Sequence, residues 1–220
     1  EMSASLVGSE MCIRDRARIL SSLFDIKEVV KVLDYFEERE NAYIVMEFVQ
    51  GISLRQYLES RNQPMSFTEA WNFLLPVMEA LEKVHQNKLI HRDISPDNFI
   101  IKEDGSIKLL DFGSAREYAE EKTMTVLVKK GYAPPEQYSR KGKQGPWTDI
   151  YSICATLYEM ITGVIPQPAM ERLKADKLYL PSSYGCDITP LQEKILMKGL
   201  ALDYKKRYKD IACLLYTSDA

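Results

Sequence analysis

Two carboxylates and one amide are the side chains whose types and spacing are best suited to catalysis. The run HRDISPDN, residues 91–98, contains Asp93 and Asn98, and the tripeptide DFG begins at Asp111. A carboxylate such as Asp93 can accept or orient the proton of an attacking hydroxyl. Oxygen atoms of Asn98 and Asp111 are the hard ligands that Mg²⁺ prefers. Together these groups could align a hydroxyl with a phosphoryl group whose charge a metal ion neutralises.

The order and spacing of these motifs resemble the catalytic loop and magnesium loop of the eukaryotic-type protein kinases. Asn98 follows Asp93 by five residues and Asp111 follows it by eighteen, as in that family. HRD alone could be a surface turn, but the joint spacing favours the family. The resemblance covers residues 17–212 and is to the serine/threonine kinases of this family. The residues of the motifs HRDISPDN and GYAPPEQY are similar to those of bacterial members. The resemblance implies transfer of the γ-phosphoryl group of ATP, with Mg²⁺, to Ser or Thr hydroxyls of a protein substrate.

Two other functions are compatible with parts of this pattern. A pseudokinase that serves as a binding or scaffold module need not keep Asp93, Asn98 and Asp111, which are all present. A small-molecule kinase of the aminoglycoside or choline type shares the Asp-x4-Asn loop. That class lacks the segment from DFG to APE, which this sequence contains. The motifs therefore favour a protein kinase over both alternatives.

The resemblance also implies where ATP binds. The run YIVMEFV, residues 43–49, is similar to the last strand of the small lobe and the hinge. It implies that Met46 is the gatekeeper and that the backbones of Glu47 and Val49 meet the adenine edge. Ile100 is expected to form the floor below the adenine. Core packing is a second role for Met46 and Ile100.

Three residues are expected to brace the helical part of such a fold. Glu136 ends APPE, which resembles the APE element of the family and implies an ion pair with Arg207. Asp149 matches the aspartate that starts the central helix and holds the backbone of the catalytic loop. His91 is expected to pack behind the magnesium loop, with no acid–base role. His85 lies on an apolar helix face and is interpreted as a core residue.

Arg92, beside the catalytic Asp93, suggests regulation by phosphorylation, since the guanidinium group binds phosphate well. Thr125 aligns best with the usual phosphorylated position of an activation loop, and Thr123 lies two residues before it. The alternative is a solvated threonine without modification.

Ser95 and Lys129 depart from the family pattern. Ser/Thr kinases usually carry Lys two residues after the catalytic aspartate and Thr ahead of APE, whereas this sequence has Ser95 and Lys129 there. Our hypothesis is that the two residues have exchanged places. Lys129 then reaches the γ-phosphate and Ser95 makes the hydrogen bond at the nucleotide. The alternative is that Lys129 is a solvated surface charge.

The 220 residues contain no glycine-rich loop, strand lysine or helix glutamate of the kind that covers ATP in this family. Aligned with the family, that glutamate would fall at Arg16. Active kinases require these groups to hold the phosphates. The remaining strands would also expose an edge and apolar surface. We therefore expect the polypeptide as written to be inactive and poorly soluble.

Strand patterns come first and helical patterns later, which predicts an α+β fold. Taken with the resemblance, this implies two lobes, with an incomplete small β lobe and a mostly helical large lobe. Expected strands cover 29–36 and 42–49, joined by a turn at 37–41, and short extended pieces cover 89–90, 99–101 and 107–110. Expected helices cover 53–60, with Ser53 as N-cap, 66–87, 148–162, 190–200 and a start at 207–212.

Both ends of the sequence look unlike natural protein. Leu6–Arg16 and Cys213–Ala220 resemble in-frame translations of adapters used in DNA sequencing libraries, and Glu1–Ser5 is grouped with the first. We therefore exclude 1–16 and 213–220 from the fold. The partial kinase domain is then predicted at 17–212, with 17–50 as the remnant of the small lobe and hinge and 51–212 as the large lobe.

Composition limits the remaining possibilities. The chain of 220 residues is 45% hydrophobic and 28% charged, as in one ordinary globular domain. A net charge of −3 offers no basis for binding nucleic acid, and no apolar run is long enough to span a membrane. Without the two ends only Cys154 and Cys186 remain, which favours a reducing, cytoplasmic setting and no metal cluster. The oligomeric state stays open.

Overall fold

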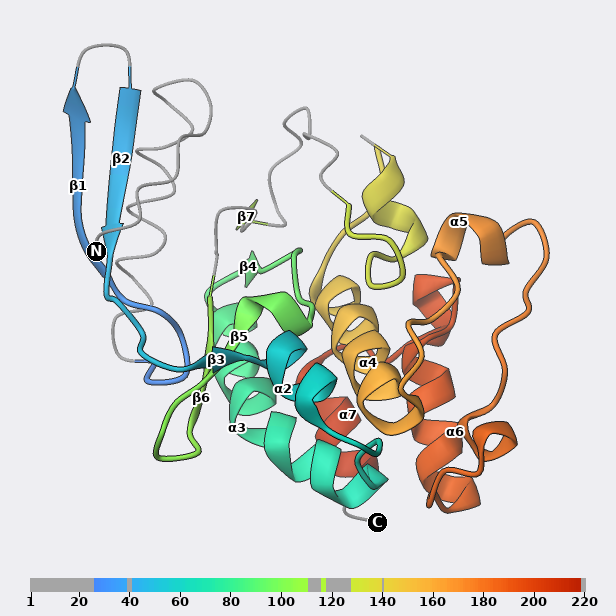
Figure 1. The fold of residues 1–220 in the computed structure, drawn as a ribbon. Helices are drawn as coiled ribbons and strands as arrows, with labels where there is room; N and C mark the ends of the chain where they lie inside the picture. The colour runs from blue at the N-terminus through green and yellow to red at the C-terminus, as the bar shows by residue number, and fades with distance from the viewer. Residues whose placement is uncertain (1–25, 39–40, 111–115, 118–127, 140, 219–220) are drawn as a thin grey trace.

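Strands and helices follow each other in a computed structural model that describes residues 26–38, 41–110, 116–117, 128–139 and 141–218 (Figure 1). The strands are β1 (Val32–Glu38), β2 (Asn41–Met46), β3 (Ile52–Ser53), β4 (Leu89–Ile90), β5 (Phe99–Ile101), β6 (Ile107–Leu109) and β7 (Arg116–Glu117). The α-helices are α2 (Leu54–Ser60), α3 (Phe67–Gln86), α4 (Pro146–Thr162), α5 (Ala169–Arg172), α6 (Pro190–Gly199) and α7 (Ile211–Ser218). Short 3-10 turns are η1 (Pro96–Asn98), η3 (Pro135–Tyr138), η4 (Pro181–Tyr184) and η5 (Tyr204–Lys206).

The antiparallel hairpin of β1 and β2 stands apart from the helices (Figure 1). Its first strand begins at Val32 rather than at the predicted Val29, because Val29 forms a bridge with Leu109 of β6. The backbone N–H of Val30 also donates to the carbonyl of Leu109, at 3.1 Å. The residues before the hairpin are thus anchored on the helical part of the molecule. Strand β2 ends at Met46, three residues before the predicted end at Val49.

Helix α4 lies at the centre of the core, between α3 and α6 (Figure 1). Every residue of α4 from Thr148 to Thr162 is buried, including the carboxylates of Asp149 and Glu159, so other parts of the molecule cover this helix on all faces. Helix α3 buries one face, and its N-cap Ser66 accepts a hydrogen bond from the N–H of Glu69. Its observed limits lie within one residue of the prediction.

The C-terminal helix differs from its prediction. It begins at Ile211, four residues later than predicted, because the backbone at Arg207 is extended, with ψ at 179°. Helix α7 continues to Ser218 and so crosses the predicted boundary after Ala212, with Leu214 fully buried. No helix within the described ranges is long and apolar enough to cross a membrane.

Candidate active site

The loop between β4 and β5 holds Asp93 and Asn98 together. The side-chain nitrogen Nδ2 of Asn98 donates to the backbone carbonyl of Asp93 at 2.6 Å and to its Oδ2 at 3.0 Å. The backbone N–H of Asn98 donates to the carbonyl of Ser95, which closes the turn η1. Because Nδ2 is used within the loop, Oδ1 is the atom of Asn98 that can ligate a cation.

His91 ties this loop to the end of β6. Its Nδ1 accepts from the backbone N–H of Asp93 at 3.2 Å, and its Nε2 lies 2.8 Å from the carbonyl oxygen of Leu110. These two bonds require the tautomer with its proton on Nε2. The N–H of Leu110 in turn donates to the carbonyl of Asn98 at 2.7 Å. His91 is fully buried, and its two ring nitrogens join the catalytic loop to the residue after β6.

Asp149, at the start of α4, holds the backbone of the same loop. Its Oδ2 accepts from the N–H of His91 and its Oδ1 from the N–H of Arg92, both at 2.8 Å. Nε2 of His85 lies 2.8 Å from Oδ2. Burial alone would raise the pKa of Asp149, but the bonds from His85 and Arg92 and the nearby His91 hold that pKa below its usual value. The carboxylate therefore stays ionised inside the core.

The backbone of Arg92 has φ at 73°, a left-handed conformation that residues other than glycine rarely adopt. The bond from its N–H to Asp149 and a bond from Gln137 Nε2 to its carbonyl, at 2.7 Å, hold the peptide from both sides. Strain of this kind persists only where neighbours over-determine the geometry, and it is concentrated at functional sites. The backbone thus turns sharply at Arg92, directly before Asp93.

Lys129 and Ser95 lie together although 34 residues separate them. Nζ of Lys129 donates to Oγ of Ser95 at 2.9 Å and forms an ion pair with Asp97. Burial alone would raise the pKa of Asp97, but Lys129 and Arg55 lower it below its ordinary value. Sequence reasoning missed Asp97, although its place between Asp93 and Asn98 was a signal.

The segment after β2 is tied to the sheet of β5 and β6. The carboxylate of Glu47 forms an ion pair with Lys108 and accepts from the backbone N–H of Lys31 at 2.9 Å. Lys108 lies directly opposite Ile100 in the register of β5 and β6. The pKa of Glu47 is lowered, since these bonds outweigh the effect of burial. Lys108 carried no sequence signal beyond its place in a strand.

Met46 and Val49 flank this tie and are half-buried against the core. The backbone N–H of Glu47 donates to the carbonyl of Lys31 at 2.9 Å, which leaves its carbonyl as the backbone group suited to an adenine amine. The structure therefore ties Glu47, through Lys108, to the sheet that contains Ile100.

Glu136 and Arg207 form a buried, two-pronged ion pair. Nη1 of Arg207 lies 2.6 Å from Oε1 of Glu136, and Nη2 lies 3.0 Å from Oε2. The side chain of Arg207 is 0% exposed and that of Glu136 is 6% exposed. This pair joins the turn η3 to the residues that precede α7.

The predicted magnesium site is described only in part. Asn98 fits a ligand role, since its amide is oriented by two bonds within the loop. Asp111 follows directly on Leu110 in the sequence but lies outside the described residues, as do Thr123 and Thr125. In the part of the chain that is described, no group of three His, Cys, Asp or Glu side chains could hold a metal ion.

Comparison with known proteins agrees with this geometry. The family model described as "Protein kinase domain" matches residues 8–198. Serine/threonine-protein kinase PrkC of Bacillus subtilis is 35% identical over 89% of this chain and 31% of its own length. Probable serine/threonine-protein kinase PknB of Lactococcus lactis is 32% identical over 83% of this chain and 30% of its own length. The chain thus spans about a third of the length of these relatives.

A solved structure titled "PpkA-294 apo form" superposes with a TM-score of 0.78 and 29% identity. The superposition covers 94% of this chain and 73% of that one. The predicted α+β, kinase-like fold is therefore confirmed. With the family match over most of its length and the loop geometry described above, the chain belongs to the protein kinase family.

Proposed function

We propose that the protein is a serine/threonine protein kinase that transfers the γ-phosphoryl group of ATP to hydroxyls of protein substrates. The observation that carries the proposal is the catalytic loop, in which Asn98 is bonded to Asp93 and both are braced by His91 and Asp149. A scaffold protein has no chemical need for a carboxylate and an amide held in this way. The relatives named as serine/threonine kinases support the choice of acceptor.

Each residue has one task in this proposal. Asp93 orients the acceptor hydroxyl and takes its proton, while Asn98 and Asp111 hold Mg²⁺ through oxygen atoms. When bound, the metal ion neutralises phosphate charge. The adenine lies against Met46 and Ile100, with its edge at the backbones of Glu47 and Val49.

The exchange of Ser95 and Lys129 belongs to the same proposal. Their contact at 2.9 Å supports it, because each residue stands within reach of the place that its counterpart holds in other kinases. Lys129 then reaches the γ-phosphate, and Ser95 makes the hydrogen bond at the nucleotide. Activity lost in Lys129→Thr and in Ser95→Lys should return in part in the double variant. Additive losses without rescue would refute the exchange.

The decisive experiment measures phosphoryl transfer from radiolabelled ATP by the protein expressed from its native gene. We expect Mg²⁺-dependent transfer to Ser or Thr, abolished by chelation of the metal. Asp93→Asn should lower kcat by at least about a hundredfold, because it removes the proton acceptor. The matched control is Asp104→Asn, an exposed aspartate in the turn between β5 and β6, which should leave kcat unchanged. No transfer above that of Asp93→Asn would instead favour a pseudokinase.

Two further parts of the proposal have their own tests. The 220-residue polypeptide should show no transfer even when the native gene product is active, because it contains no glycine-rich loop or strand lysine. Phosphorylation of Thr125 or Thr123, read by Arg92, should appear in peptide mass spectra of the active protein. A reducing, cytoplasmic setting is supported by Cys154 and Cys186, which are both free thiols.

A further inference from the structure

Arg55 on α2 lies at the centre of a charged cluster that the proposed chemistry does not use. Its guanidinium group forms an ion pair with Glu159 of α4, and Nη2 lies 2.6 Å from the hydroxyl oxygen of Tyr132. Nε lies 3.5 Å from Oδ1 of Asp97. The hydroxyl of Tyr132 in turn donates to Glu159. One arginine thus occupies two carboxylates that come from different parts of the chain.

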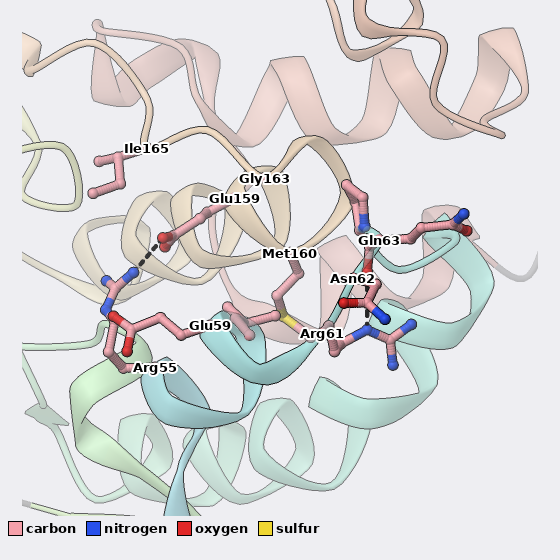
Figure 2. Close-up of a pocket in the computed structure, with 11 residues that line it drawn as sticks. Arg55, Glu59, Arg61, Asn62, Gln63, Glu159, Met160, Gly163 and Ile165 are labelled. Carbon is pink, nitrogen blue, oxygen red and sulfur yellow. Dashed lines mark hydrogen bonds and ion pairs between the residues drawn. The ribbon is translucent and has the colours of Figure 1, made fainter.

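Two members of this cluster, Arg55 and Glu159, line a cavity of about 390 Å³ that is open to solvent. Figure 2 shows Arg55 reaching from α2 to Glu159 on α4, with Met160 and Ile165 among the other residues that line the cavity. The lining combines apolar side chains with these charged groups. None of the residues proposed to contact the nucleotide lines this cavity. This cavity is therefore separate from the proposed nucleotide site.

The cavity lies one side chain away from the catalytic loop. Asp97, which contacts Arg55, is four residues after Asp93 and also pairs with Lys129. An extended peptide advances by about 3.3 Å per residue. With its acceptor hydroxyl at Asp93, a substrate could place a side chain two or three positions away beside Arg55.

Arg55 decides the charge that such a side chain meets. Without it, Asp97 and Glu159 would present two carboxylates balanced by Lys129 alone, which would attract a lysine or arginine of the substrate. With it, the three groups and Lys129 sum to zero formal charge. The hydrogen bonds that Arg55 donates to Glu159 and Tyr132 outweigh burial and raise the pKa of Arg55, so its charge is permanent.

We propose that Arg55 is a specificity-determining residue. Its guanidinium group binds the carboxylates of Asp97 and Glu159, which a basic side chain of the substrate would otherwise bind. The substrates are then polypeptides with acidic or uncharged residues within three positions of the acceptor. This inference rests on the proposed kinase function.

The test compares peptides that differ only in Arg, Ala or Asp at each of the three positions on either side of a Ser acceptor. Binding is measured by fluorescence anisotropy and transfer by kcat/KM, both with the native gene product. Wild type should bind Arg peptides no better than Ala peptides. Arg55→Ala and Arg55→Gln should each raise the preference for Arg over Ala, at one position, by about tenfold. Arg55→Lys keeps the charge and should keep the wild-type ranking.

Two controls locate the effect. Arg61→Ala removes another arginine that lines the cavity but that pairs with the exposed Glu69, and it should leave the ranking unchanged. Adding Asp97→Asn to Arg55→Ala should remove the gained preference, because one carboxylate is lost.

The proposal is overturned if both Arg55→Ala and Arg55→Gln rank the peptides as wild type does, or if Arg61→Ala produces the same gain. The anisotropy arm does not depend on catalysis. Failure of phosphoryl transfer would therefore count against the kinase function, whereas an unchanged binding ranking would count against the role of Arg55.

Discussion

The buried pair of Glu136 and Arg207 allows a quantitative prediction for stability. All five N–H groups of the Arg207 guanidinium have an acceptor. Two bonds go to Glu136 at 2.6 and 3.0 Å. The other three go to the carbonyls of Ala201, Trp147 and Leu202 at 2.6, 3.1 and 3.0 Å. One side chain therefore joins η3, the start of α4 and the segment after α6.

Replacing Arg207 with Met removes all of these bonds and leaves the carboxylate of Glu136 buried. Among the described residues, Thr148 is then the remaining side-chain donor, at 3.2 Å. Breaking a buried ion pair in this way destabilises a protein by about 3–5 kcal/mol. That is a large part of a typical total of about 5–15 kcal/mol. Arg207→Lys should also be strongly destabilising, since three donors on one atom cannot reproduce the two-pronged geometry.

The assay is urea unfolding followed by fluorescence of Trp71 and Trp147, with the free energy obtained by linear extrapolation. The double variant Glu136→Gln, Arg207→Met should be more stable than Arg207→Met, because it removes the uncompensated charge. Arg61→Ala is the control, since it breaks a pair with Glu69 that is 43% exposed and should lose less than about 1 kcal/mol. A loss in Arg207→Met no greater than in this control would refute the reasoning.

Three further predictions concern buried groups. The lowered pKa of Asp149 means that its ionised form stabilises the fold at neutral pH and that this contribution is lost as pH falls through the folded-state pKa. Urea midpoints of wild type and Asp149→Asn should therefore differ most near neutral pH and converge below about pH 4, and a constant difference would contradict this. Gly199→Ala should destabilise by about 1–3 kcal/mol, because a Cβ there overlaps Sγ of Cys154, and Cys154→Ala should relieve the loss in urea unfolding. Burial raises the pKa of the Cys154 thiol to about 12, so this thiol should react slowly with iodoacetamide. After brief treatment, mass spectrometry should find Cys154 unmodified and the exposed Cys213 labelled. Equal labelling of the two would show that α4 opens readily.

Local chemistry made some elements predictable and left others out of reach. Helix α3 was located to within one residue because Ser66 is an N-cap and one face is apolar, and both signals are local. The start of α7 was placed four residues early, since the extended backbone at Arg207 depends on Glu136, 71 residues away. The start of β1 was misplaced because Val29 pairs with Leu109 of a distant strand.

The sequence by itself indicated the protein kinase family and predicted which residues do the chemistry. The types and spacing of Asp93, Asn98 and Asp111 can be read from the sequence alone, because all three lie in short motifs whose order and spacing are typical of the family. It also indicated that Lys129 and Ser95 depart from the family pattern.

Only the tertiary structure decided which charges meet. Lys129 contacts Ser95 and Asp97, and Arg55 pairs with Asp97 and also with Glu159, from which 104 residues separate it. Such pairs depend on how α2, the catalytic loop and α4 pack, since ion pairing requires approach within a few ångströms whatever the separation in sequence. The local pattern around each residue contains no information on that approach, so the charge of the proposed substrate site became visible only in the folded chain.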